Sequence, residues 1–408
     1  MSSEAPIFTR GFVLICLATF LSGSAQSLVL PAIPLLLTQM GLAPEFVGLF
    51  VGAFSLGALI VRFPVGAGVD RLGWRAFGMG GAGLLGGGCL LYALVPFVPA
   101  QVPLTATVPL LLPLAGIAHS VGFSSYGTSA SSFVAHTVPA TRRGEAVGYY
   151  GIVSSVAWGL GAGVSLLIVG TWGFSVLLGT AALMAVLAAI VSFCLHDTPR
   201  TGDSAFSTAS AFRIETKVLV PALVSAALAA GAGTALAFIP LLGVERGIAN
   251  PGIYFTAVAL TSIAFRIIAG RLADIYGRFA SIIPGMLLAT AGLLLVARAS
   301  STQTLVLAGI VYGTGSASAA PALLALIIDL AGPARRGAAM AIHWAMLDVG
   351  VSGGSIITGQ IAPLVGYGGA FVAASSAPLV GLGGFLAYAG LRRMRAGGDS
   401  NTRYHADM

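Results

Sequence analysis

The feature that most constrains the fold is a series of long apolar runs, each separated from the next by a short stretch containing glycine, proline or charge. The runs repeatedly reach the roughly 20 residues that a helix needs to cross a bilayer. The chain is 57% hydrophobic and only 8% charged, whereas an ordinary soluble domain is about 25% charged. The sequence therefore predicts an all-α integral membrane protein.

Twelve runs can be counted, divided by one long polar stretch near the middle. In the first half they lie near 11–37, 46–67, 76–97, 104–134, 145–170 and 173–195. In the second half they lie near 217–242, 252–272, 279–297, 303–331, 337–364 and 368–391. We expect a six-helix bundle over 1–195, a cytoplasmic linker over 196–216, and a second six-helix bundle over 217–408 that ends in a short cytoplasmic tail.

Charge orients these helices. Of the 20 Lys and Arg residues, sixteen fall on the side of the N-terminus and two on the other side, while Arg62 and Arg266 lie within helices. Positive loops stay in the cytoplasm, so both termini are expected there. The same distribution explains the net charge of +7 without a nucleic-acid partner. The short loops, with no N-x-S/T acceptor, fit a multi-pass protein of a plasma membrane, the bacterial inner membrane.

An internal repeat is the strongest motif of the chain. The shared residues are Arg62, Gly66, Asp70 and Gly73 in the first copy, and Arg266, Gly270, Asp274 and Gly277 in the second, 204 positions later. A second echo pairs 33–36 with 239–242, and a third pairs 139–144 with 333–337. Three echoes in the same order indicate two homologous bundles. Many transporters are built from such repeats, with a solute site near the membrane midplane.

The run Gly66-x3-Asp70-Arg71-x-Gly73-x-Arg75 resembles the signature loop of the major facilitator superfamily, and the resemblance covers essentially the whole chain. The stretch from His119 to 146 also resembles bacterial sugar-efflux and drug- or metabolite-efflux members. Two departures from the drug antiporters argue against proton-driven drug export. Gly116 stands where an arginine is often found. The run 145–170 has Gly159, Gly161 and Gly163 but no Gly-Pro pair.

The resemblance implies a latch on the cytoplasmic side. Asp70 would meet the start of the run 337–364, and Asp274 the start of the run 145–170, because a carboxylate there is stabilised by the exposed N–H groups and the helix dipole, by about 0.3–1 kcal/mol. Gly66 would let another backbone approach. Alternatively, these charges only anchor the topology. The candidate latch residues are Gly66, Asp70, Arg71, Gly73, Arg75, Gly270, Asp274, Gly277 and Arg278.

An ionisable side chain at membrane depth is expected to have a functional or structural role, because its insertion costs at least about 2.5–3.5 kcal/mol. Asp348 is the only carboxylate expected at central depth, as a proton carrier, a cation-binding group or a structural partner. His119 forms an i, i+4, i+7 stripe with Phe123 and Tyr126. The resemblance places that stripe in the central cavity, and the alternative is a core histidine. Because histidine titrates near neutral pH, Asp348 and His119 together could relay protons.

Further candidates are neutral. Gln26 and Tyr312 can hydrogen-bond a solute, and Trp158 and Trp344 can stack on one, although packing roles explain them equally well. Arg62 and Arg266 are expected to snorkel, or to pair with loop carboxylates, rather than to bind solute.

No enzyme or nucleotide-binding motif is found, and no His/Cys metal cluster, so the sequence predicts a non-enzyme without cofactor or metal that is driven by a proton gradient. The favoured function is export of a small, neutral or weakly cationic organic solute in exchange for protons. The alternative is an uptake symporter or facilitator for a neutral metabolite, and a remote one is a non-transporting receptor. The expected partners are the solute and the lipid bilayer, and a monomer is the default.

Overall fold

The structure is a computed structural model that describes residues 7–94, 104–138, 142–196, 216–331 and 336–404. Over these residues the chain is helical, without strands. The helices are α1 (Arg10–Val29), α2 (Ile33–Gln39), α3 (Pro44–Leu72), α4 (Trp74–Leu94), α5 (Leu104–Thr137), α6 (Arg143–Phe193), α8 (Thr216–Glu245), α9 (Ile253–Tyr276), α10 (Phe279–Arg298), α11 (Thr302–Ala331) and α12 (Arg336–Tyr404).

Two helices are far longer than a membrane is thick, and each contains two spans. The helix α6 has 51 residues and α12 has 69, whereas 20 residues already cover about 30 Å. Both turn back at a glycine in the left-handed region, Gly173 with φ 81° and Gly366 with φ 72°, a conformation that only glycine adopts readily. With these breaks, and with α1 and α2 as one span, the described helices make the twelve predicted spans.

The glycine breaks also confirm the internal repeat. Gly173 and Gly366 are 193 positions apart, which is the spacing of Arg142 and Arg335 in the third echo. The loops after α3 and α9 likewise match, because both helices end at a left-handed glycine, Gly73 with φ 88° and Gly277 with φ 86°. The two halves of the chain therefore share one backbone plan.

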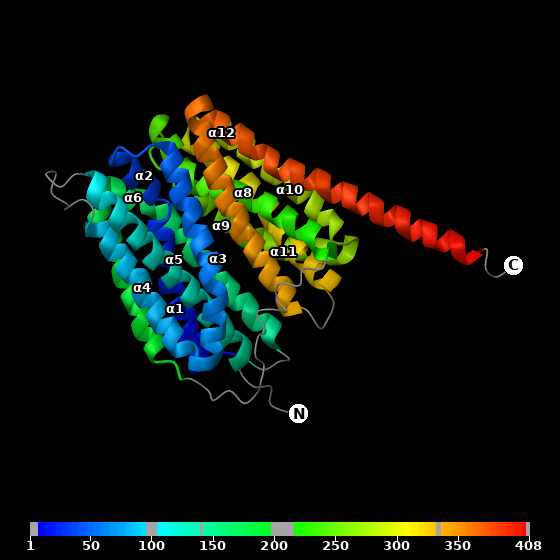
Figure 1. Ribbon diagram of the computed structural model, residues 1–408, viewed down its shortest axis with the longest axis horizontal. Helices are drawn as coiled ribbons and strands as arrows, with labels where there is room; N and C mark the ends of the chain where they lie inside the picture. The colour runs from blue at the N-terminus through cyan, green and yellow to red at the C-terminus, as the bar shows by residue number, and fades with distance from the viewer. Residues whose placement is uncertain (1–6, 95–103, 139–141, 197–215, 332–335, 405–408) are drawn as a thin grey trace.

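Two helix boundaries differ from the sequence prediction. The first run was expected to be continuous over 11–37, but α1 ends at Val29 and α2 begins at Ile33. Pro31 explains the break, because proline lacks the N–H that a helix interior needs. At the other end, α12 continues to Tyr404 instead of stopping near 391, and it projects from the bundle in Figure 1.

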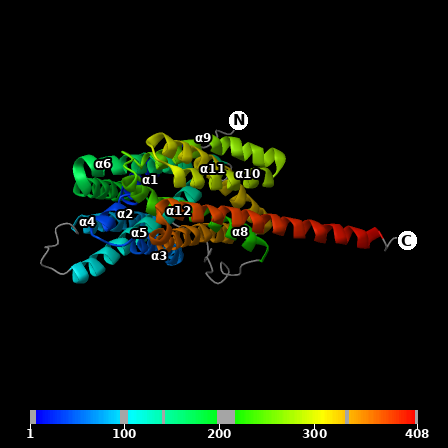
Figure 2. The same ribbon diagram turned by 90° about the horizontal axis from the view of Figure 1, so that it is seen from above.

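The two halves lie side by side, with α1–α6 in one and α8–α12 in the other (Figures 1 and 2). Within the halves, α1 packs on α6, α4 on α5, α8 on α12 and α10 on α11. Between them, α3 packs on α12 and α6 on α9. We call the end where α1 begins the near end, and the end where α2 lies the far end. The helices α3 and α9 run from far to near.

The outer surface is strongly apolar. Eight of the described helices, including the double helices α6 and α12, are long and apolar enough to cross a membrane. Large apolar side chains such as Leu364, Val380 and Ile60 are 82%, 72% and 70% exposed. Water would not tolerate so much apolar surface, whereas lipid does. The chain is a multi-pass membrane protein.

Candidate functional site

The first contact between the halves is the 3/12 seam, where α3 meets α12. At the far end its two backbones touch through glycines. A Cβ atom on Gly48 would lie 2.9 Å from the Cα atom of Gly359 and against the backbone oxygen of Ser355, and one on Gly52 would meet the side chain of Ile356. Small residues allow helices in a membrane to pack this closely. The 3/12 seam is therefore sealed at the far end.

The second contact is the 6/9 seam, where α6 meets α9. Here Gly159 and Gly163 would clash with Ala259 and Thr256 if they carried a Cβ atom. The hydroxyl of Thr256 donates a hydrogen bond to the carbonyl of Gly159 at 3.1 Å. The 6/9 seam is thus sealed at the same end as the 3/12 seam, and by the same kind of contact.

The near end of both seams is different. A Cβ atom on Gly66 of α3, or on Gly148 of α6, would meet none of the described residues within 4 Å. The described residues therefore show no close backbone approach at Gly66 in this conformation, and the predicted role of this glycine in a latch stays a prediction. The structure is closed at the far end and apart at the near end.

An ion pair crosses the 3/12 seam at membrane depth. The Arg62 Nη2 atom of α3 lies 3.1 Å from the Asp348 Oδ2 atom of α12. The two side chains are 31% and 20% exposed, so each charge would be poorly solvated without the other. Arg62 was expected to snorkel or to pair with a loop carboxylate. That expectation is wrong, because its partner is the one carboxylate predicted at central depth.

The 6/9 seam carries the equivalent arginine without an acid. Arg266 lies ten residues before the end of α9, as Arg62 does in α3 (266 to 276, and 62 to 72). Its Nη1 atom would lie 3.3 Å from a Cβ atom on Gly151 of α6. Ser155, 193 positions before Asp348, stands where the acid would be expected, and its hydroxyl donates to the Gly151 carbonyl at 2.9 Å. No acidic partner of Arg266 occurs among the described residues.

His119 is enclosed inside the first half. Its side chain is 1% exposed, and its Nε2 atom forms a hydrogen bond with the amide oxygen of Gln26, which is also 1% exposed. The rings of Phe54 and Tyr92 lie edge-on at centroid distances of 5.0 and 5.8 Å. These partners come from α1, α3 and α4. The described contacts of His119 and Asp348 do not join the two residues, so the proton relay stays a prediction.

The remaining solute candidates also contact helices of their own half. Phe123 lies 6.4 Å from Trp158, measured between ring centroids. The hydroxyl groups of Tyr126 and Thr19 are 2.9 Å apart, and the hydroxyl of Tyr312 donates to a backbone carbonyl of α8 at 3.3 Å.

Trp344 is 47% exposed and lies beside His343. Of the solute and proton candidates, Asp348 is the one whose described contacts reach the other half.

Two of the latch residues, Arg75 and Arg278, have a described contact within their own half. Arg278 pairs with Asp329 of α11 at 3.5 Å, and the Arg75 guanidinium lies 4.1 Å from the centre of the Phe193 ring. Arg71 is exposed. The side chains of Asp70 and Asp274 and the surroundings of Gly270 lie outside the described part of the chain, as do most residues of the expected linker, so the latch remains a prediction.

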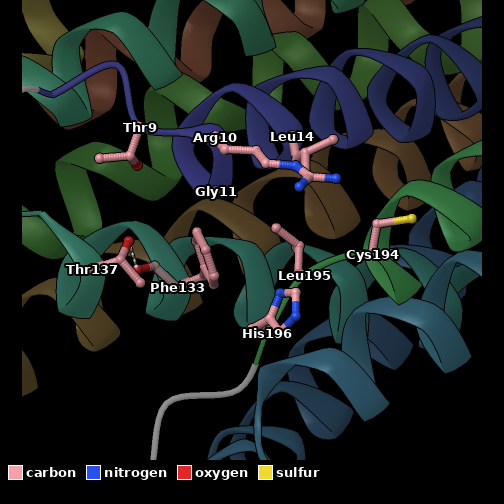
Figure 3. A pocket seen from close by; sticks show the side chains of 9 residues that line it. All are labelled: Thr9, Arg10, Gly11, Leu14, Phe133, Thr137, Cys194, Leu195 and His196. Atoms are coloured by element: carbon pink, nitrogen blue, oxygen red, sulfur yellow. Dashed lines mark hydrogen bonds between the residues drawn. The ribbon is translucent and has the colours of Figure 1, made fainter.

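A separate pocket of 240 Å³ lies at the near end of the first half, between the start of α1 and the ends of α5 and α6 (Figure 3). Arg10, His196 and Cys194 are its charged or titratable side chains, and Leu14, Phe133 and Leu195 supply apolar walls. None of the candidate residues lines this pocket. It lies within one half, so it is not the gap between the halves.

Two six-helix halves that are sealed at one end and apart at the other define the class, a membrane transporter with its passage between the halves. Residues 15–254 and 221–403 match the family model of the Major Facilitator Superfamily. The chain belongs to that superfamily, as its motifs indicated.

Individual proteins agree with this assignment. An uncharacterised MFS-type transporter of Methanocaldococcus jannaschii is 22% identical over 377 residues, covering 88% of this chain and 92% of the relative. The crystal structure of a mutant of the nucleoside transporter NupG superposes with a TM-score of 0.77 at 13% identity and covers 93% and 99% of the two chains. A bacterial homologue of the lysosomal transporter Spinster gives 0.75 at 14% identity, covering 92% and 95%. These structures share the fold.

Proposed function

We propose that this transporter exports a small organic solute in exchange for protons, by alternating access between its two halves. The scarcity of charged side chains in the helices supports a solute with little charge, which the sequence suggests is neutral or weakly cationic. The proton gradient would supply the energy. We further propose a monomer with the boundaries expected from the sequence, in a bacterial inner membrane, with the near end facing the cytoplasm.

The observation that carries the proposal is the ion pair between Arg62 and Asp348. A carboxylate at membrane depth can bind a proton, and protonation removes its attraction to the guanidinium. The pair joins one helix of each half, so its strength affects how easily the 3/12 seam separates. Proton binding at Asp348 would thus be linked to movement of the halves, which is what coupled transport requires.

The packing of the seams supports the alternating part of the mechanism. Glycine contacts seal both seams at the far end, and the near-end Gly66 and Gly148 face open space. With the orientation expected from the basic loops, this state opens to the cytoplasm and would accept solute there. The reverse state would close Gly66 and Gly148 and part the far-end glycines. His119 would then serve as a core residue held by Gln26.

The test begins with a thermal-shift screen of the full-length protein against organic solutes, and continues with flux of the best ligand in liposomes. We expect a pH gradient to drive uphill flux in the wild type, with the direction of the gradient separating export from uptake. Asp348→Asn should lower gradient-driven flux at least tenfold while solute exchange without a gradient survives. Glu245→Gln, which removes an exposed acid at the end of α8, is the control. Full coupling in Asp348→Asn would reject the proposal.

A further inference from the structure

We infer that Arg266 is a binding site for an anionic group of the transported solute, a carboxylate or a phosphate. The inference rests on the proposed transport function and revises its substrate class, from a neutral or weakly cationic solute to one that carries an anionic group. It starts from the two matched arginines, Arg62 and Arg266, of which the 3/12 seam neutralises one and the 6/9 seam leaves the other without an acid.

The position of Arg266 at the 6/9 seam supports this site. The Arg266 guanidinium reaches α6 of the opposite half, because its Nη1 atom would lie 3.3 Å from a Cβ atom on Gly151. Gly151 has no side chain to cover the cation, and the Arg266 side chain is exposed. Trp344 occupies the position equivalent to Gly151 in the second half, 193 residues later. The first half thus leaves room beside its arginine where the second half has a large ring.

The charge of Arg266 also supports this site. An arginine at membrane depth keeps its proton and needs an acceptor or water. At Arg62, the facing helix supplies an acid, Asp348, that neutralises the cation. At the equivalent position the facing helix carries Ser155, whose hydroxyl donates to its own helix. Among the described residues, the acceptor for Arg266 does not come from the protein.

Chemistry then defines the ligand. A guanidinium presents parallel N–H donors that match the two oxygens of a carboxylate or a phosphate. Arg266 is exposed, and toward the near end of the same seam no described residue lies within 4 Å of a Cβ atom placed on Gly148. A solute entering from the near end would therefore meet this cation. The class is an organic acid or a zwitterion, in contrast to the weakly cationic solute expected from the sequence.

The test uses purified full-length protein in detergent and a panel of carboxylates and phosphates of graded size, each with its uncharged amide or alcohol. We expect at least one anion to raise the melting temperature of the wild type more than its uncharged match does. Arg266→Gln should lose this difference, Arg266→Lys should keep part of it, and Arg298→Gln, which alters an exposed arginine at the end of α10, should keep it in full. An Arg266→Gln protein that responds as the wild type does, or a panel without any anion-specific shift, would overturn the inference.

A second variant supplies the missing acid. Ser155→Asp would give the 6/9 seam the charge pair that the 3/12 seam has, so it should abolish the anion-specific shift, whereas Ser155→Asn should not. Equal shifts in both variants would count against the inference. Lipid is the other source of phosphate. A response that appears with phosphatidylglycerol alone, and with none of the soluble anions, would assign Arg266 to lipid and reject the solute site. These binding measurements need no gradient, so their failure is distinct from a failure of proton-coupled flux.

Discussion

The 3/12 and 6/9 seams are built on one plan and differ in one property. Both are sealed at the far end by glycines, Gly48 and Gly52 in one and Gly159 and Gly163 in the other. Both place an arginine eleven residues before a left-handed glycine. Among the described residues, an acid faces the arginine of the first seam and none faces that of the second. The duplicated halves have kept what close packing requires and have diverged in charge, where coupling and solute recognition would be decided.

The largest effect is expected from breaking the packing that the seams share. Gly48→Leu would force a side chain into the backbone of α12, so the far end could not close. We expect flux to fall at least tenfold and the melting temperature to drop, because overpacking costs about 1–3 kcal/mol. Gly163→Leu should do the same in the other seam. Gly83→Leu is the control, because its Cβ atom would meet nothing within 4 Å. Wild-type flux in both seam variants would show that the seams do not seal the passage.

A smaller effect is expected from removing the ion pair that distinguishes the 3/12 seam from the 6/9 seam. Arg62→Gln or Asp348→Asn alone leaves one poorly solvated charge. We expect each variant to lower the free energy of unfolding by up to about 3 kcal/mol. The loss is smaller than for a fully buried pair, because both side chains are partly exposed. The double variant should cost less than the sum, by about 1 kcal/mol or more. The matched cycle of Arg266→Gln and Ser155→Asn should be additive. Chemical or thermal unfolding measures both cycles, and equal coupling in the two would erase the distinction.

The smallest effect concerns the one side-chain hydrogen bond described across the 6/9 seam. Thr256→Val keeps the shape and removes the hydroxyl that donates to the Gly159 carbonyl. We expect a loss of about 1 kcal/mol, seen as a modest fall in melting temperature. Thr180→Val is the matched control, because that hydroxyl bonds only within its own helix. A larger loss in Thr180→Val than in Thr256→Val would argue against this contact as a seam element.

The sequence predicted the membrane fold well for a physical reason. In lipid a span must satisfy its own backbone hydrogen bonds, so length and apolarity largely decide where it lies. The repeat also predicted that Gly73 and Gly277 would correspond. The break at Pro31 could have been foreseen from proline's missing donor.

The candidate site was less predictable, because it depends on which helices meet and how far apart their ends are. Asp348 was identified by its depth, but its pairing with Arg62 requires α3 to lie beside α12. The sequence feature that could have predicted this pair is the opposite charge of Arg62 and Asp348 at matching depth in their helices. The sequence left His119 open between the central cavity and the core, because a helical stripe does not say which neighbour it faces. Its ring lies against Gln26, Phe54 and Tyr92 in one half.

The central claim is that the halves are joined at the far end in this state and must part there for transport. The direct measurement is a reversible cross-link between Gly52→Cys and Ile356→Cys, in a background where Cys16, Cys89 and Cys194 are alanine. A Cβ atom on Gly52 would touch the Ile356 side chain, which is within reach of a disulfide. We expect the disulfide to form under mild oxidation and to stop flux, and reduction of the disulfide should restore flux. A double-cysteine protein that fails to cross-link, or that transports at the wild-type rate when cross-linked, would contradict it.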